Sequence, residues 1–131
     1  MPLSRAQVQV LELALEDRRR VLDAELRRDA ERVRAESFRE TAGPVTDLGD
    51  EALADVIADL DNADLTRDLN ELRAIDAALA RMANGKTYGR CAECALEIPY
   101  ERLKAEPAAL RCVDCQRVHE RTYAGTRTPR L

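Results

Sequence analysis

The sequence predicts a mainly helical protein: a long antiparallel two-helix coiled-coil hairpin, then a small cysteine-rich module and a short C-terminal helix. Three observations support this fold class. The 131 residues are 45% hydrophobic but 3% aromatic, without tryptophan, so the apolar content is mostly Ala, Leu and Val, a composition that favours helices. Two long stretches carry apolar residues at helical spacing. Four cysteines follow as two close pairs.

The first predicted helix begins at Ser4, which is followed three residues later by Gln7 in the pattern of a capping box. Apolar residues then recur at spacings of three, four or seven as far as Val33. We expect the helix to end at Gly43-Pro44, because glycine adopts the left-handed conformation of a helix C-cap and proline cannot continue a helix.

A second periodic stretch of nearly the same length starts near Asp50 and stops at residues 84–85, an Asn-Gly pair. Because a short connection joins two long helices, they should be antiparallel neighbours with a tip at residues 42–50. We therefore expect a hairpin domain over residues 1–85 and a cysteine-rich module with a final helix over residues 86–131. An ordinary helical bundle core is the alternative explanation of both apolar stripes.

Charge is distributed unevenly along the chain. The net charge is −4, which argues against a protein that coats nucleic acid. Residues 44–85 carry three basic and ten acidic side chains, whereas residues 86–131 carry nine basic and six acidic ones. The middle of the chain is thus an acidic arm. The run Arg18-Arg19-Arg20 is interpreted as a solvated face, because acids are interspersed with such basic residues.

The cysteines form two C-x2-C pairs, Cys91 with Cys94 and Cys112 with Cys115, separated by seventeen residues. The N-terminus has neither the pattern of a signal peptide nor that of a membrane span, so we expect a cytoplasmic protein, and in a reducing compartment paired cysteines are more often metal ligands than disulfides. Four thiolates suit closed tetrahedral coordination, which predicts one structural zinc ion (Zn2+) whose binding supplies folding energy.

A catalytic zinc would need an open coordination position and a nearby general base, and this sequence offers neither, so we expect no enzyme activity. His119 is expected to be a surface or packing residue. A thiol redox pair or a disulfide set remains the alternative for the cysteines. An oxidoreductase, however, needs one exposed cysteine of low pKa at a helix N-terminus, and two symmetrical pairs do not match that pattern.

The cysteine spacing alone also resembles the GATA type of DNA-binding finger, so the residues around the cysteines must indicate which kind of zinc finger this is. The segments YGRCAEC (88–94), EIPYERL (97–103), AEP (105–107) and CVDCQ (112–116) closely resemble the DksA/TraR family of bacterial transcription regulators. The long predicted hairpin ahead of the finger is similar to the DksA branch of that family.

This resemblance implies a regulator that binds bacterial RNA polymerase directly and inserts its coiled-coil tip into the secondary channel to modulate initiation, as in the stringent response. No sequence-specific DNA contact is implied, and we expect a monomer. The family motif D-x-x-D-x-A fits Asp47, Asp50 and Ala52, and Arg67 aligns with a basic position used near the polymerase. Acids at a helix start also cap free N–H groups, so a purely structural role is the alternative for both aspartates.

The family binds guanosine tetraphosphate through three basic positions, and these carry Ala74, Glu106 and Gln116 here. Phosphates need cationic partners, so the resemblance implies a weak or absent response to that nucleotide. Arg73 and Arg117 lie one residue away and would restore two charges if the alignment shifted.

A GATA-like DNA-binding zinc finger is the alternative function. Its support is the basic C-terminal stretch, which contains Arg117, Arg121, Arg127 and Arg130. Against it stand glutamates in the finger, where phosphates would have to approach. They are Glu93, Glu97, Glu101 and Glu106.

Overall fold

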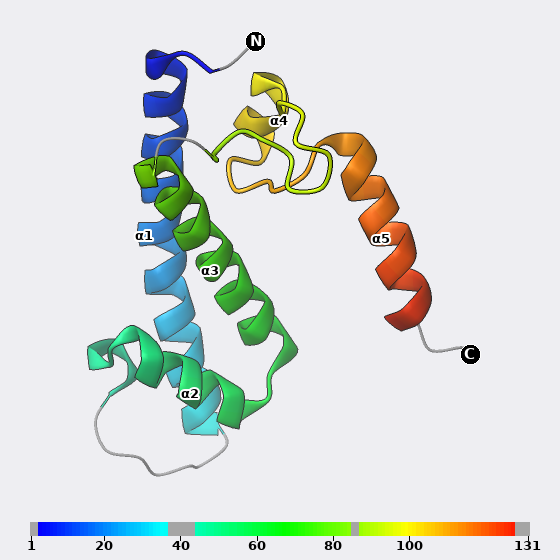
Figure 1. Ribbon diagram of the computed structural model, residues 1–131. Coiled ribbons are helices and arrows are strands. Elements are labelled where there is room, and N and C mark those ends of the chain that lie inside the picture. Colours follow the sequence, from blue (N-terminus) through cyan, green and yellow to red (C-terminus); the bar gives the residue numbers. More distant parts are fainter. Residues whose placement is uncertain (1–2, 37–43, 85–86, 128–131) are drawn as a thin grey trace. The chain divides into compact units, whose positions relative to one another are not determined.

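The computed structural model describes residues 3–36, 44–84 and 87–127, and in these ranges the chain is mainly helical, as predicted (Figure 1). The elements in chain order are α1 (Arg5–Glu36), the 3-10 helix η1 (Val45–Asp47), α2 (Asp50–Leu60), α3 (Ala63–Asn84), α4 (Tyr100–Ala105) and α5 (Val113–Arg127). Among these helices, none has the length and apolar character needed to span a membrane.

The start of α1 confirms the predicted capping box. The backbone N–H of Ser4 donates to Oε1 of Gln7 at 2.9 Å, and the backbone N–H of Gln7 donates to Oγ of Ser4 at 3.1 Å. Two backbone donors at the helix start are thereby satisfied. The described part of α1 ends at Glu36, so the predicted end at Gly43 lies outside the described residues.

The second arm is not the one continuous helix that the periodicity predicted. Helix α2 ends at Leu60, and its C-cap residue Asp61 adopts the left-handed conformation (φ 52°, ψ 48°) and donates its N–H to the carbonyl of Ile57. Asn62 then accepts the N–H of Leu65 on its side-chain oxygen at 3.1 Å, which caps α3. Aspartate and asparagine tolerate these conformations better than other residues with side chains, so the Asp-Asn pair separates two helices within an unbroken apolar pattern.

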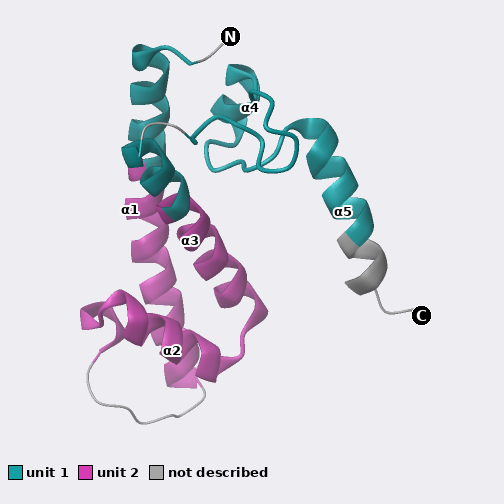
Figure 2. Ribbon diagram, in the orientation of Figure 1, with its two compact units in different colours: residues 1–15, 77–131 teal, residues 16–76 magenta. Residues whose placement is uncertain are grey.

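The chain forms two compact units (Figure 2). The arm unit comprises residues 16–76, and the cysteine unit comprises residues 1–15 and 77–131. Helices α1 and α3 each contribute to both units. The predicted domain boundary after residue 85 therefore falls inside the cysteine unit, and separate roles for residues 1–85 and 86–131 stay a prediction.

The arm unit is built from parts of α1 and α3 and from all of α2, which packs against both of them (Figure 1). Its core is a set of aliphatic side chains from the helices and the η1 turn. They are Leu22, Leu26, Ala30, Val45, Leu53, Ile57, Leu65, Leu69, Leu72 and Ile75. Residues 44–50, expected at the hairpin tip, contain the buried Val45 and the start of α2.

The cysteine unit has a smaller core, in which the metal-binding segment takes part. Leu11, Cys91, Ile98 and Leu103 are buried together. Gly89 lies beside this core with φ of 88°, and a Cβ there would come within 3.1 Å of a methyl carbon of Leu3. Glycine thus satisfies both a left-handed backbone and a close approach at this position.

Candidate metal centre and acidic segment

A tight turn presents the first cysteine pair. The Cys91 N–H donates to the carbonyl of Leu96 at 2.8 Å, and the N–H of Ala95, at φ of 66°, donates to the Cys91 carbonyl at 3.0 Å. Folded in this way, the turn points the N–H groups of Glu93 and Cys94 at the Cys91 sulfur, at 3.4 and 3.5 Å. Backbone donors aimed at a sulfur stabilise its thiolate form, which is the form that binds a metal.

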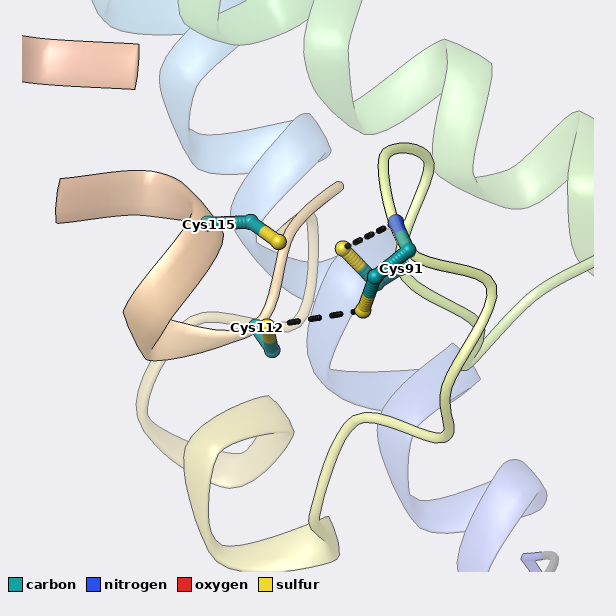
Figure 3. A group of neighbouring side chains, drawn as sticks. Cys91, Cys112 and Cys115 are labelled. Atoms are coloured by element: carbon teal, nitrogen blue, oxygen red, sulfur yellow. Dashed lines mark hydrogen bonds between the residues drawn. The ribbon is translucent and has the colours of Figure 1, made fainter. Parts of the chain in front are cut away.

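The second pair lies at the start of α5. Figure 3 shows the side chains of Cys91, Cys112 and Cys115 gathered together, with Cys115 on the first turn of that helix. The N–H of Gln116 donates to the Cys112 carbonyl at 2.8 Å, which begins the helix immediately after this cysteine. The two pairs are joined by a backbone hydrogen bond of 2.8 Å from the N–H of Ala92 to the carbonyl of Leu110.

The four sulfur atoms lie within 4.8 Å of one another, and Sγ of Cys94 is 3.9 Å from Sγ of Cys112. Sulfurs bound tetrahedrally to one zinc, with bonds of about 2.3 Å, are separated by about 3.8 Å. The cluster therefore fits a single closed zinc site. His119 is not part of this group of ligand atoms, in agreement with the role expected for it.

The electrostatic environment differs among the thiols. Burial opposes ionisation of Cys91, but N–H groups of Cys94, Cys112 and Glu93 outweigh it and lower the pKa of Cys91 to about 6. Hydrogen bonding with the Cys112 thiol raises the pKa of Cys115 above its ordinary value. One thiolate is thus favoured before a metal arrives, and metal binding must displace the remaining protons.

Side chains around the cluster hold its loops together. The guanidinium of Arg111 contacts the Glu93 carboxylate at 3.4 Å, which connects the second cysteine pair to the first. Arg102 donates from Nε to the carbonyl of Arg111 at 2.8 Å. The hydroxyl of Tyr88 donates to the carbonyl of Pro107 at 2.7 Å, and burial raises the pKa of Tyr88 to about 12, so it remains a donor.

Of the sequence-predicted tip residues, Asp47 and Asp50 lie within residues 44–50 of the arm unit, which we call the acidic segment, and Ala52 follows it on α2. Asp47 ends η1 and is exposed, while Asp50 begins α2 with 68% of its side chain exposed. Ala52 is half-buried in the first turn of α2. Both oxygens of the Asp50 carboxylate contact α1: Oδ1 lies 3.1 Å from Nη2 of Arg27, and Oδ2 lies 3.4 Å from Nη2 of Arg19.

Arg18 and Arg20 are exposed and Arg19 is half-buried. Arg18 and Arg19 also make ion pairs between helices that the interpretation as a solvated face did not include. Arg18 pairs with Glu71 of α3 through two hydrogen bonds of 2.8 and 3.0 Å. Arg19 pairs with Asp76 of α3 as well as with Asp50. Sequence reasoning missed these contacts and those of Arg27 with residues 45–50, because partners eighteen or more residues away cannot be found from local spacing.

The remaining sequence-predicted positions are on helix surfaces, except for Glu106, which is the C-cap residue after α4. Arg67 is 73% exposed and pairs with Asp64 on its own helix, at 3.3 Å. Ala74 is exposed on α3. The carboxylate of Glu106 lies 3.7 Å from Arg102, and the side chain of Gln116 donates to Glu120 at 2.9 Å.

Known proteins resemble both the finger and the whole chain. The family model for the prokaryotic dksA/traR C4-type zinc finger matches residues 86–121. General stress protein 16O of Bacillus subtilis is 31% identical over 102 residues, which is 74% of this chain and 62% of that protein. The RNA polymerase-binding transcription factor DksA from two Buchnera aphidicola strains is 37% and 36% identical, over 47% and 51% of this chain. The chain spans 39% and 44% of those two proteins.

A solved structure extends the similarity beyond the finger. Transcription factor DksA2 from Pseudomonas aeruginosa superposes with a TM-score of 0.66 and 27% sequence identity, covering 92% of this chain and 88% of that one. The matching finger contains the four clustered thiols, so the chain holds one structural zinc ion. Residues 86–121 thus form a dksA/traR C4-type zinc finger, within a chain whose fold is similar to that of DksA2.

Proposed function

We propose that this protein binds bacterial RNA polymerase and regulates transcription, without catalysing a reaction itself. The observation that carries this proposal is a DksA/TraR zinc finger within a fold similar to DksA2 over nine-tenths of the chain. Two relatives whose names describe RNA polymerase binding support the same partner. With a partner of this kind, we expect the protein to act in the bacterial cytoplasm, and a monomer is sufficient for binding.

The finer proposal is that the arm unit enters the secondary channel of the polymerase and acts there through Asp47 and Asp50. The exposure of both side chains supports it, because an acid that modulates a catalytic centre must be able to reach it. Ten acidic residues within 44–85 also suit a channel through which nucleotide-bound magnesium passes. Ala52 and Arg67 are secondary candidates on the same unit.

We further propose a weak or absent response to guanosine tetraphosphate. The side chain of Glu106 is 68% exposed and would repel a phosphate. Gln116 carries no charge, and Ala74 offers no donor. The neighbouring Arg117 is 71% exposed, but its guanidinium lies 3.9 Å from the carboxylate of Asp114, which offsets its charge.

In vitro transcription with purified polymerase tests the proposal. Asp50→Asn removes the charge with little change in shape, so we expect the effect on initiation to be lost while polymerase binding persists. Asp55→Asn is the matched control, since Asp55 is exposed on the same helix. An unchanged effect with Asp50→Asn would contradict the role of the acidic segment. A large gain on adding guanosine tetraphosphate would contradict the proposed nucleotide independence.

A second measurement separates the DNA-binding alternative. The surface of the finger exposes glutamates, with side chains of Glu93, Glu101 and Glu106 exposed by 54%, 83% and 68%. DNA affinity depends strongly on cationic contacts, so we expect negligible duplex binding by the protein alone, even at low salt. Tight binding in a gel-shift assay would favour the GATA-like function instead.

A further inference from the structure

Arg27, near the middle of α1, is enclosed by the acidic segment. Only 13% of its side chain is exposed. Its Nη1 donates to the carbonyls of Leu48 and, at 3.4 Å, Val45, and its Nη2 donates to Oδ1 of Asp50 at 3.1 Å. Its Nε donates to Asp23, one turn earlier on α1, at 3.1 Å. One guanidinium thus contacts the backbone on both sides of Asp47 and the carboxylate that follows.

The chemistry of arginine suits this arrangement. A guanidinium is planar, permanently charged and carries five N–H donors in a fixed fork, whereas a lysine ammonium offers three donors at a single point. Asp23 orients the fork from its own helix, at 3.1 Å from Nε. The other donors then face three acceptors of residues 45–50, and together these contacts tie the segment to α1.

Local structure alone holds this segment weakly. The residue before α2 is Gly49, which has no side chain to cap the helix. At the other end, the N–H of Val45 donates to the Glu31 carboxylate of α1 at 2.9 Å, and the Val45 side chain is fully buried. One end of the segment is therefore held by Glu31 of α1. The other end is held through Asp50 by Arg27 and Arg19, and Arg27 also contacts backbone carbonyls between the two ends.

We propose that Arg27 is the positioning residue of the acidic segment, fixing the backbone around Asp47 and the orientation of the Asp50 carboxylate. The inference rests on the proposed function, because it assigns Arg27 to the presentation of those two acids. Arg27 acts through them and not by touching the polymerase, since its own side chain is almost enclosed. Arg19, which contacts the second oxygen of Asp50 at 3.4 Å, supports the same orientation.

The test compares Arg27→Gln with Arg20→Gln. Arg20 lies on the same helix, has a side chain that is 67% exposed and pairs with Asp17, outside the acidic segment. At saturating protein, Arg27→Gln should lower the maximal effect on initiation about tenfold, as expected for loss of a charge-assisted hydrogen bond. The concentration that gives half of the effect should stay the same. Arg20→Gln should change neither quantity, and Arg27→Lys should restore part of the effect.

Two further measurements separate positioning from loss of folding. Amide hydrogen exchange should accelerate at residues 44–50 in Arg27→Gln, with α3 protection and zinc content unchanged. Polymerase binding by the double variant Arg27→Gln/Asp50→Asn should equal that of Asp50→Asn, because the enclosed Arg27 side chain does not touch the polymerase, whereas an unfolded arm unit would weaken binding. If Arg27→Gln instead unfolds the arm unit, Arg27→Lys replaces it in the test. Partial restoration of the effect by Arg27→Lys, at an unchanged half-effect concentration, would support positioning, and no restoration in a folded Arg27→Lys protein would contradict it.

The possible failures are distinguishable. If Asp50→Asn abolishes the effect and Arg27→Gln keeps or increases it, the inference is overturned. An increase would mean that the ion pair with Arg27 keeps the Asp50 carboxylate from acting on the polymerase. If Asp50→Asn has no effect, the proposed function fails. Unchanged exchange at residues 44–50 in Arg27→Gln would contradict the positioning role whatever the transcription result.

Discussion

The arm unit and the cysteine unit are stabilised by different means. Among its described residues the arm unit buries ten aliphatic side chains, nine from three α-helices and one from η1, and it adds interhelical ion pairs such as Arg18 with Glu71. By the same measure the described part of the cysteine unit buries five aliphatic side chains together with Cys91, which is also a metal ligand and lies in its core cluster. Apolar burial is therefore the main stabilising term in the first unit, whereas zinc ligation is part of the core in the second.

The difference follows from how much each segment can bury. Helix α4 has six residues, too few to be stable alone, and the loops around it pair through single hydrogen bonds. A module of this kind needs a metal or a disulfide to fold. The acidic segment lies in the unit that needs neither. The residues of the proposed activity thus lie in the helical arm unit, while zinc binding stabilises the cysteine unit.

Zinc removal should have the largest effect. Structural zinc contributes about 10–16 kcal/mol in zinc-finger peptides at neutral pH, so a chelator or Cys112→Ser should unfold the cysteine unit. Helical protection in residues 16–76 should largely remain, because its buried side chains do not depend on the metal. Amide exchange in each unit, together with zinc analysis, measures both outcomes.

Ala92→Ser is the matched control for the cysteine variant, because Ala92 is exposed between two ligands and should leave zinc content unchanged. Lowering the pH should weaken zinc binding, since protons compete for the thiolates. Retained protection at Ile98 and Leu103 in the metal-free protein would contradict the proposed origin of this unit's stability.

A core substitution in the arm unit should have the next largest effect. Leu22 is 1% exposed, and Leu22→Ala should destabilise this unit by about 2–5 kcal/mol through lost burial and the cavity left behind. Its neighbour Val21 is 45% exposed, so Val21→Ala should change stability by less than about 0.5 kcal/mol. Denaturant unfolding measures both, and zinc content should be unaffected. Equal losses in the two variants would rule out the assigned core face.

The Arg18–Glu71 ion pair should have the smallest effect. Hydrogen bonding to Arg18 lowers the pKa of Glu71 below its ordinary value of 4.5. The pair therefore stabilises the folded state above about pH 4.5, and this contribution is lost as the pH falls through the lowered pKa. Both side chains are nearly half-exposed, so Glu71→Gln should cost at most about 1 kcal/mol at pH 7.

That difference should shrink as the pH falls below 4.5 through the lowered pKa of Glu71 and the carboxylate of the parent protein becomes protonated. Urea unfolding at pH 7 and across this acidic range measures it. Arg18→Gln should show the same pH dependence, and the double variant should lose no more than either single variant. A pH-independent difference would mean that packing, and not charge, accounts for the effect.

Local patterns predicted several features correctly. The pairing of Ser4 with Gln7 depends on three residues of separation, and the structure contains it. The zinc ion could be predicted from the cysteine spacing, because each C-x2-C pair forms a local turn that presents two thiolates and two such pairs supply four ligands. The break at Asp61-Asn62 was missed, since apolar spacing continues across it, although the two residues themselves are a recognisable capping signal.

By itself, the sequence determined the helical class, the capped start of α1 and the chemistry of the metal site, because each depends on residues close together in the chain. Only the tertiary structure decided that α2 packs against both long helices and that Arg27 is surrounded by the segment that carries Asp47 and Asp50. Such contacts join residues about twenty positions apart through a fold that local spacing does not encode. The roles of Asp47, Asp50, Ala52 and Arg67 at the polymerase stay predictions.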